Sequence, residues 1–280
     1  MSKPTKRGSV PTVLAVTSDH HANSTVSMCP PEGVRLPDGG VYAPSKANLW
    51  LWQCWEDYWR EVAALTKAHG AELVCVFNGD AVEGEHHRNT QVISHNPETQ
   101  AYVSDRVFGV PMALKPARTF IVRGTEAHVG PSGASEEALG RHLKAERDPE
   151  TDAWSFWRLR LRLHGKLFDF QHHGRQGGRP WTMHGAVGNL AAHIAVEHVW
   201  AEEEVPAFAF RSHRHVFGDS GVRSKPRTIQ TPAWQLKTGY AHKVAAESIA
   251  DIGGVIVILH PDRAPDVRPV LFRPKLPKEV

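Results

Sequence analysis

Short clusters of histidine and carboxylate residues recur along this chain, each directly after an apolar run that is typical of a β-strand. The five clusters are Asp19-His20-His21, Asn78-Gly79-Asp80, Gly124-Thr125-Glu126-Ala127-His128, His172-His173-Gly174 and Ser212-His213-Arg214-His215. Imidazole and carboxylate groups together bind transition metals, and two divalent ions held about 3.5–4 Å apart need a shared carboxylate between them. The clusters therefore predict a centre for two metal ions.

The position of each cluster after a strand-like run predicts where the side chains meet. In open α/β sheets, ligands bind beyond the carboxyl ends of the strands, so clusters that are distant in sequence converge in space. Asp80 is the candidate for the carboxylate shared by both ions. Alternation of side chains along an extended segment puts Asp19 and His21 on one side and His20 on the other. We therefore expect Asp19 and His21 to be ligands.

The same alternation applies to the last cluster. It assigns His213 and His215 to the metals and directs Arg214 elsewhere, toward a substrate phosphate. A His-x-His pair after a strand thus predicts two ligands and one substrate contact.

Four further side chains in loops near these clusters are candidates for substrate binding. His86 and His87 follow Asp80 closely, and Arg175 and Arg179 flank a Gly-Gly pair after the fourth cluster. Arginines on a glycine-rich loop suit phosphate binding, although a solvated polar loop is an equally good interpretation of both segments.

Taken in order, the clusters resemble the calcineurin-like metallophosphoesterase superfamily. Its pattern is Asp-x-His, Gly-Asp-x-x-Asp, Gly-Asn-His-Asp/Glu, a lone His often followed by Gly, and Gly-His-x-His, and the resemblance spans residues 18–215. It implies a first metal held by Asp19, His21, Asp80 and His215, and a second held by Asp80, His173 and His213. His173 is preferred to His172 because it precedes Gly174. Glu83 stands where the family has Asp, and the resemblance gives it an orienting hydrogen bond rather than a metal.

The third cluster departs most from the family pattern because it is two residues longer. The family has an Asn ligand and a catalytic His directly after the glycine, whereas this chain reads Gly-Thr-Glu-Ala-His. The resemblance then implies that Glu126 replaces the Asn ligand and that His128 is the general acid that protonates the leaving alkoxide. The hydroxyl of Thr125 is the alternative near the metal.

The resemblance implies metal-dependent hydrolysis of a phosphate ester. The protein-phosphatase branch has Asp-Arg-Gly after its second motif, where this chain has Glu83-Gly84-Glu85. We therefore favour a phosphodiesterase or nuclease acting on nucleic acid or a nucleotide. A phosphomonoesterase or protein phosphatase and an inactive, metal-binding interaction protein are the alternatives. Two divalent ions are the expected cofactors, with Mn as the default and Fe, Zn, Co or Ni as alternatives, because Asp, His and Glu ligands accept all of them.

A segment rich in tryptophan is a further candidate for binding. Trp52, Trp55 and Trp59 have the spacing of one face of a helix, which favours packing in the core or a contact between copies of the chain over a base-stacking platform.

Composition limits the class of protein. A formal charge of +3 and a pI near 8.8 are compatible with an anionic substrate but do not indicate nucleic-acid binding. Three cysteines form no metal-type pair and leave one thiol unmatched, which favours a reducing compartment. The basic start is followed by a short apolar run and then Asp19, so we expect no signal peptide, no membrane span and a cytoplasmic protein.

The elements that must position the clusters follow from periodicity. Apolar runs at about 11–17, 72–77 and 118–123 alternate with helical patterns at about 46–69, 97–115 and 134–147, which predicts βαβ units and a largely parallel sheet. Period-two alternation around His164-Gly165 predicts a hairpin that begins a second sheet, followed by a helix at about 184–204 and further strands. Residues 22–45 have no periodicity and predict a long loop.

We expect one domain over residues 11–262, with a basic tail at 1–10 and a second tail at 263–280. The resemblance implies an α/β fold of four layers, an α/β/β/α sandwich of two stacked mixed sheets, metallo-dependent phosphatase-like.

Overall fold

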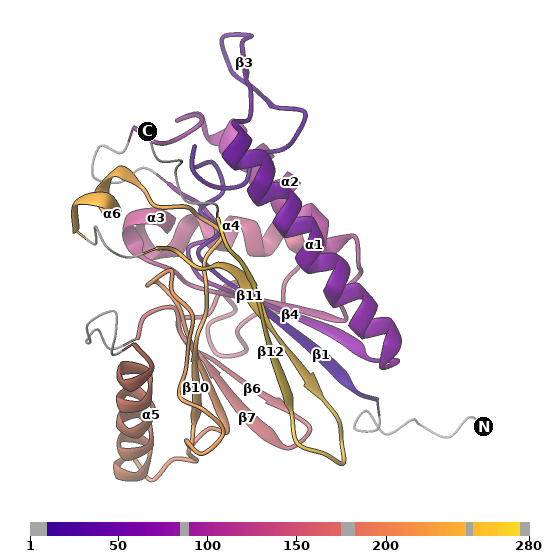
Figure 1. The fold of residues 1–280 in the computed structure, drawn as a ribbon, viewed down its shortest axis with the longest axis vertical. Coiled ribbons are helices and arrows are strands. Elements are labelled where there is room, and N and C mark those ends of the chain that lie inside the picture. Colours follow the sequence, from indigo (N-terminus) through magenta and orange to yellow (C-terminus); the bar gives the residue numbers. More distant parts are fainter. Residues whose placement is uncertain (1–9, 85–89, 175–182, 245–248, 275–280) are drawn as a thin grey trace.

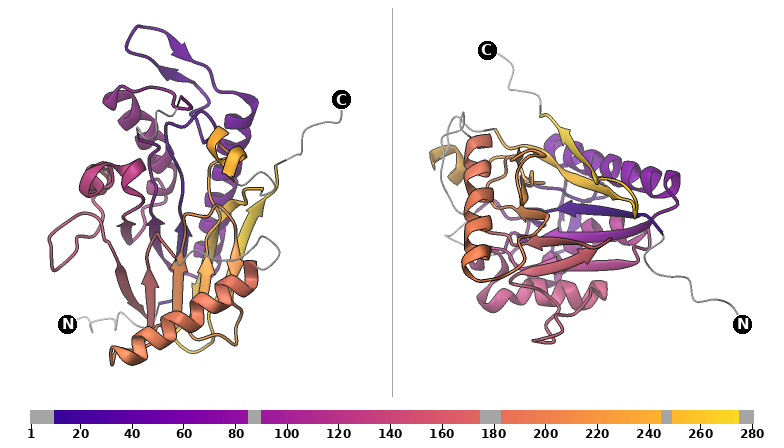
Figure 2. Two further views of the ribbon diagram at one scale, coloured as in Figure 1. Left: turned by 90° about the vertical axis from the view of Figure 1, so that its left-hand side faces the viewer. Right: turned by 90° about the horizontal axis from the view of Figure 1, so that it is seen from below.

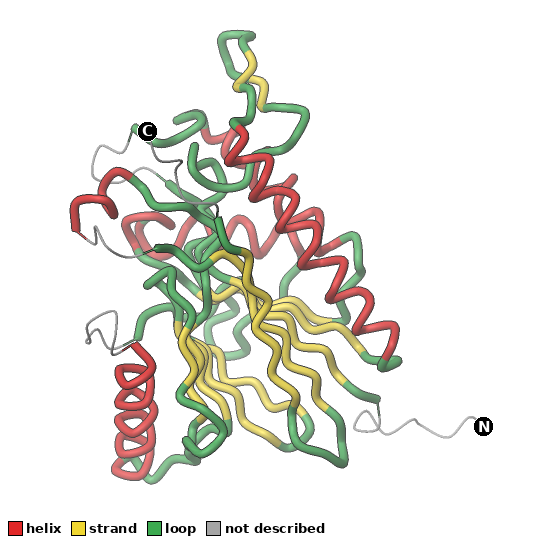
Figure 3. Tube along the Cα trace, viewed as in Figure 1, coloured by secondary structure: helices red, strands yellow, loops and turns green. Residues whose placement is uncertain are grey.

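The computed structural model describes residues 10–84, 90–174, 183–244 and 249–274. Within them, two five-stranded mixed sheets stack face to face, and helices lie on both outer faces (Figure 1; Figure 3). This arrangement confirms the predicted α/β/β/α sandwich. In the described part of the chain, no helix combines the length and the apolar character that crossing a bilayer requires.

The first sheet has the strand order β12-β11-β1-β4-β5. Strands β1 (Thr12–Thr17), β4 (Glu72–Asn78) and β5 (Arg118–Val122) are parallel, while β11 (Ile252–Leu259) and β12 (Asp266–Phe272) add antiparallel pairs. Helices α1 (Lys46–Ala68), α2 (Pro97–Met112) and α4 (Ala134–Leu143) form its outer layer, with α1 against β1 and β11 and α4 against β5. The predicted βαβ units are confirmed, and the parallel strands all end at one edge.

The second sheet has the order β6-β7-β8-β10-β9. The predicted hairpin is β6 (Leu159–Leu163) with β7 (Lys166–Phe170), and β8 (Phe208–Arg211) and β10 (Arg227–Gln230) continue parallel to β7. Strand β9 (Gly218–Asp219) closes the sheet. Helix α5 (Met183–Trp200) covers the outer face near β9 and β10 (Figure 2).

Apolar side chains from both sheets fill the space between them. Alternation along β6 buries Leu159, Leu161 and Leu163 and leaves Arg160 and Arg162 exposed, as a strand with one buried face requires. These leucines join the phenylalanines of β7 and β8 and the aliphatic side chains of β1, β4 and β11 in one core cluster.

The aromatic side chains of the tryptophan-rich segment, which is part of α1, lie in a second core cluster between this helix and the first sheet. Trp52, Trp55, Tyr58 and Trp59 are all buried, and Trp55 donates a hydrogen bond to the carbonyl oxygen of Val107 at 2.9 Å. Packing in the core, the first of the two predicted roles, is therefore the one the structure supports. These four side chains are covered by their own chain and are not available for a contact with another copy.

The C-terminal segment differs from the prediction. The tail expected from residue 263 contains β12, which pairs with β11 from Asp266 to Phe272. The segment was mistaken for a tail because it is an exposed edge strand with charges and a proline, and Pro269 is tolerated at an edge.

Short elements complete the fold. The long loop at residues 22–45 contains a small hairpin of β2 (Val34–Arg35) and β3 (Val41–Tyr42). Helices α3 (Glu126–Val129) and α6 (Gly239–Val244) and a 3₁₀ turn at Pro131–Gly133 lie in the connections above the sheets (Figure 1).

A buried ion pair holds β7 against β8 in the second sheet. Asp169 is fully buried and accepts a hydrogen bond of 2.6 Å from Nη2 of Arg211, which is 5% exposed. Burial alone would raise the pKa of Asp169, but Arg211 and then Arg158 outweigh it and lower this pKa. Stability from a carboxyl with a depressed pKa is present above its unfolded pKa and is lost as the pH falls through the folded one.

We expect Asp169→Asn to lower the free energy of unfolding by about 3–5 kcal/mol at neutral pH, because Arg211 would be left buried without a counter-charge. The difference from the unchanged protein should shrink below about pH 4, where aspartate titrates. Urea unfolding across pH measures both effects. The control is Asp266→Asn, which breaks an ion pair with Arg268 that is about half exposed and should change stability by less than about 0.5 kcal/mol. Equal losses in the two variants would contradict the prediction.

Candidate metal centre

The loops that follow β1 and β4 run side by side at the edge where the parallel strands end. Backbone hydrogen bonds join them in sequence: the amide of Asp19 donates to Gly79 at 2.9 Å, and the amide of His21 donates to Asp80 at 3.0 Å. From the second sheet, the amide of His213 donates to the Asp19 carboxylate at 3.2 Å. The two sheets therefore deliver their loops to one place, as the position of the clusters after strands predicted.

The backbone of the predicted ligands is unusual. The residues with a positive φ include Asp19 (50°), His21 (45°), Asp80 (52°), His213 (75°) and His215 (55°). Residues other than glycine rarely adopt this left-handed region, and such strain is concentrated at functional sites. The prediction from alternation assumed that the backbone is extended at the first and last clusters. The backbone is turned there instead, so the ligands predicted in these two clusters were selected by a rule that does not apply to these loops.

Among the described residues, four overlapping groups of side chains could hold a metal ion, and within each group the ligand atoms lie within 4.8 Å of one another. The groups are Asp19, His21 and His215; Asp19, Asp80 and His172; His21, Asp80 and His128; and His172, His173 and His213. The predicted ligands Asp19, His21, Asp80, His173, His213 and His215 are therefore brought together, and His172 joins them.

Several ligand atoms converge on one point, which fits metal binding. Oδ1 of Asp19 is buried and accepts no hydrogen bond from a described residue, although Nε2 of His215 lies 3.3 Å away. Nε2 of His21 and Nε2 of His215 are 3.2 Å apart. Nitrogen lone pairs and a carboxylate oxygen that face one point are the donor set that a divalent transition metal accepts.

Glu83 occupies the orienting position that the resemblance gives it. Its carboxylate lies 3.0 Å from Nδ1 of His21 and also accepts from Nε2 of Gln235 at 2.7 Å. The contact fixes Nδ1 as the outer nitrogen and turns Nε2 toward Asp19 and His215. A histidine held by a carboxylate in this way is the usual arrangement around a bound metal.

Asp80 and His172 form the buried middle of the cluster. Nε2 of His172 lies 3.0 Å from Oδ2 of Asp80, and Nδ1 of His172 bonds the carbonyl oxygen of Asn78 at 2.8 Å. Burial acts against the charge on His172, but Asp80 and then Asp19 outweigh it and raise the pKa of His172 to about 10. The cluster therefore attracts positive charge strongly.

The carbonyl contact gives His172 the orientation of a ligand. With Nδ1 donating to Asn78, Nε2 faces Asp80 and Asp19, whereas the ring of His173 lies against the ring of His213 at 4.7 Å. The sequence argument preferred His173 from its neighbouring glycine, and the structure brings both rings into reach. His172 is the more buried and the closer to Asp80.

Two glycines allow this approach. A Cβ on Gly79 would lie 2.4 Å from the His172 ring, and a Cβ on Gly124 would lie 2.2 Å from the backbone nitrogen of Asp80. A larger residue would displace the His172 ring at Gly79 and Asp80 itself at Gly124.

The third cluster differs from the prediction. Glu126 is exposed at the start of α3 and belongs to none of the ligand groups. Thr125 takes the inner place instead: its amide donates to Oδ1 of Asp80 at 2.6 Å, and its hydroxyl lies 3.2 Å from both Oδ2 of Asp80 and Nδ1 of His213. The chain turns into helix α3 at Glu126, which leaves this side chain exposed at the start of the helix.

His128 lies beside the centre. Its Nδ1 bonds the carbonyl oxygen of Glu83 at 2.9 Å, and its ring contacts the ring of His21 at 4.4 Å. Burial and then the nearby His21 lower the pKa of His128 to about 4, so the ring is neutral at neutral pH and Nε2 carries the lone pair. The predicted catalytic histidine is thus near the ligands, in its unprotonated form.

Of the substrate-binding candidates, only Arg214 is described. It lies half-buried between His213 and His215. His86, His87, Arg175 and Arg179 lie outside the described residues.

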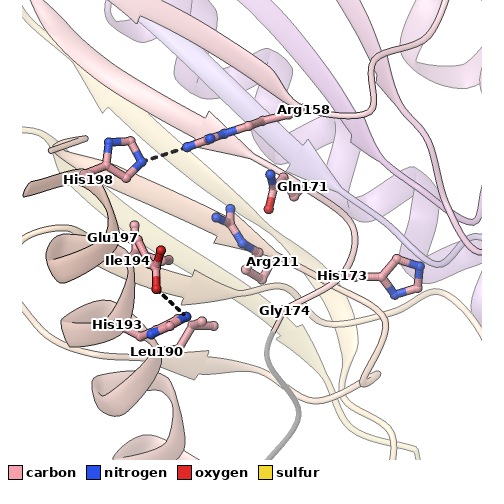
Figure 4. Close-up of a pocket in the computed structure, with 10 residues that line it drawn as sticks. All are labelled: Arg158, Gln171, His173, Gly174, Leu190, His193, Ile194, Glu197, His198 and Arg211. Carbon is pink, nitrogen blue, oxygen red and sulfur yellow. Dashed lines mark hydrogen bonds and ion pairs between the residues drawn. The ribbon is translucent and has the colours of Figure 1, made fainter. Parts of the chain in front are cut away.

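A cavity of about 250 Å³ adjoins the centre at His173 and Gly174, between α5 and the second sheet (Figure 4). Arg158 and Arg211 line it, but both guanidinium groups bond Asp169, and Arg158 also contacts His198. The positive charge of both arginines is therefore largely balanced by Asp169 within the protein.

Sequence reasoning missed Glu136 in α4. This carboxylate is fully buried and accepts hydrogen bonds from the amides of Gly124 at 2.7 Å and Ala81 at 3.2 Å. Burial and then Asp80 raise the pKa of Glu136 to about 8. Glu136 ties together the two loops that carry Asp80 and Thr125. No local pattern distinguishes it from the adjacent Glu137, since both lie in the first turn of one helix.

Comparison with models of known families and with curated proteins found no match. Among solved structures, the chain is similar to the sulfate thiohydrolase SoxB of Thermus thermophilus in complex with glycerol (12% identity, TM-score 0.45, 97% of this chain and 58% of that one). It is also similar to a hypothetical protein of Pyrococcus horikoshii (8%, 0.42, 94% and 89%) and to a dimetal phosphatase of Danio rerio (12%, 0.40, 92% and 95%). The chain spans little more than half the length of SoxB. Identities this low do not establish membership of a family.

We expect Thr125→Val to weaken binding of one metal ion, because it removes the hydroxyl beside Asp80 and His213 and keeps the side-chain volume. Loss of such a contact costs about 10–100-fold in metal affinity. Titration of metal-free protein with Mn(II), followed by calorimetry, measures it. The matched control is Glu126→Gln at the exposed neighbour, which should bind as the unchanged protein does. Weaker binding in the control alone would restore Glu126 as the ligand.

We expect Glu136→Gln to lower metal affinity by about 10–100-fold, because an amide cannot accept from both loop amides and the two loops would separate. The control is Glu137→Gln, which loses bonds to Arg123 and to the amide of Trp154 but touches neither ligand loop. It should lower thermal stability and leave metal affinity unchanged. Equal affinity losses in both folded variants would show that Glu136 has only a structural role.

Proposed function

We propose that this protein is a metal-dependent phosphoesterase that uses two divalent ions. The observation that carries the proposal is the overlap of the ligand groups: Asp19, His21, Asp80 and His172 each belong to two of them. Groups that share members describe adjoining sites rather than one isolated ion. A carboxylate between adjoining sites is the shared ligand that two-metal hydrolysis requires.

The side chains divide into two sets around Asp80. Asp19, His21 and His215 would hold the first ion, and His172 or His173 with His213 would hold the second, with Thr125 beside it. Two divalent ions in such a site polarise a phosphoryl group and lower the pKa of water, which supplies a nucleophile at neutral pH. Mn is the ion we propose, in keeping with the mixed oxygen and nitrogen donors.

The protein's own residues would handle the protons. Because Nδ1 of His128 is held by the Glu83 carbonyl, Nε2 is the atom that can exchange a proton. A neutral His128 would take up at Nε2 the proton released by the attacking water and then deliver it to the leaving alkoxide, so its role would be that of a carrier between two steps. Arg214, between the two ligand histidines, would contact a phosphate oxygen.

We extend the proposal to phosphodiesters, with a nucleotide or nucleic acid as the substrate. The support is the resemblance of the motifs: Glu83-Gly84-Glu85 replaces the Asp-Arg-Gly of the protein-phosphatase branch.

The test is hydrolysis of bis-para-nitrophenyl phosphate beside para-nitrophenyl phosphate by Mn-loaded protein. We expect activity on the diester, and Asp80→Asn should reduce it at least about 100-fold because the shared carboxylate is lost. Asp266→Asn, far from the centre on β12, is the matched control and should retain full activity.

Each result has a distinct meaning. Preference for the monoester would overturn the diester assignment and keep the phosphoesterase. Two bound ions with no hydrolysis of either ester would overturn the enzyme and favour a metal-binding interaction protein. In His128→Ala, undiminished hydrolysis with unchanged metal content would remove His128 from the mechanism.

A further inference from the structure

Helix α5 is the outermost element on the side of the second sheet (Figure 1; Figure 2). Its inner face buries Val187, Leu190, Ala191 and Ile194. Its outer face carries a stripe of exposed residues at intervals of three and four, which is the spacing of a helix that packs on another helix. The stripe consists of Gly185, Asn189, Ala192, Val196, Val199 and Trp200.

Apart from Asn189 the stripe is made of glycine and apolar residues, and none of its members is charged. Val196, Val199 and Trp200 are 42%, 64% and 76% exposed. Glu197 is the single residue among Asp, Glu, Lys and Arg in the helix. A helix that is apolar on both faces is normally buried on both, and exposed apolar patches of this kind mark interaction surfaces.

The two halves of the stripe differ in size. Gly185, Asn189 and Ala192 occupy the N-terminal half, and the bulkier Val196, Val199 and Trp200 occupy the C-terminal half. We propose that two copies of this chain associate through α5, packed antiparallel about a two-fold axis near Ala192. The bulky half of each helix then meets the small half of its partner, with Trp200 opposite Gly185. The same surface on both copies is therefore self-complementary, as a two-fold interface requires.

Charge supports the antiparallel arrangement. Glu202 is exposed directly after α5. In an antiparallel pair that places Trp200 opposite Gly185, a step of two residues beyond Trp200 places Glu202 opposite Met183, the first residue of the partner helix. The N-terminus of a helix carries partial positive charge, so a carboxylate placed there is stabilising. The neighbouring Glu203 and Glu204 are already paired with Arg160 and Arg162.

The size of the helix limits the strength of the association. Eighteen residues span about 27 Å, so one helix pair lies at the low end of specific interfaces, below about 1,200 Å² in total. An interface of this size is typical of transient association, so we expect a reversible dimer. A lipid surface fits less well, because helices that lie on membranes carry Lys and Arg on the polar face and α5 has neither.

Sedimentation velocity over a range of micromolar concentrations tests the proposal. We expect a reversible dimer, and Val199→Glu should convert it to a monomer with an unchanged far-UV spectrum and melting temperature. The control is Val222→Glu, at a residue that is 82% exposed after β9, and this variant should remain dimeric. A monomer at every concentration, or a dimer that survives Val199→Glu, would overturn the proposal.

Cysteine cross-linking tests the direction of packing, since the native Cys29, Cys54 and Cys75 are buried and leave little background. Ala192→Cys, near the axis, should form a disulfide dimer under mild oxidation. Under the same mild oxidation, Gly185→Cys and Trp200→Cys should each form no disulfide dimer on their own, and a mixture of the two should cross-link. Cross-linking of Gly185→Cys with itself would show parallel packing and overturn the antiparallel arrangement.

Discussion

The burial of the Asp80 carboxylate at the shared edge of two sheets is the constraint on which the candidate centre depends. A buried carboxylate is costly unless charges and hydrogen-bond donors surround it. Here the Thr125 amide bonds one oxygen and His172 lies against the other, and burial, which alone would raise the pKa of Asp80, is outweighed by His172 so that this pKa falls well below its usual value. The parallel strands make this possible because their ends bring amides and imidazoles to one point.

The same constraint explains why the ligand loops are turned so sharply. Asp19, Asp80 and His213 all have left-handed backbone, which costs free energy in each loop. Cross-loop hydrogen bonds, such as that from the His21 amide to the Asp80 carbonyl, offset this cost and fix the loops. The side chain of Glu136 also fixes the loops, because it accepts a hydrogen bond from one amide in each of two of them. Strain and its compensation are therefore found together, in the few residues that converge on Asp80.

Much of the fold and most of the candidate ligands could be predicted because they leave local patterns. The helices, the β6–β7 hairpin and the strands before each cluster have strong periodicity, and the ligand residue types are distinctive. Glu126 was wrongly placed because the direction of a side chain depends on where α3 begins, which the sequence does not mark. Glu136 was missed because its role lies in contacts with backbone amides, and β12 was missed because an exposed edge strand lacks a buried face.

The two outer layers show why composition alone did not locate an exposed apolar surface. The tryptophans at positions 52, 55 and 59 lie on the buried face of α1, where Trp55 also contacts Trp234 with ring centroids 4.7 Å apart. Helix α5 has a single tryptophan and no comparable pattern, yet Trp200 is exposed because, among the residues that the structure describes, no further element lies outside this helix. A large aromatic side chain is informative about binding only when the fold leaves it uncovered, and that depends on how many elements the chain places on each side of the sandwich.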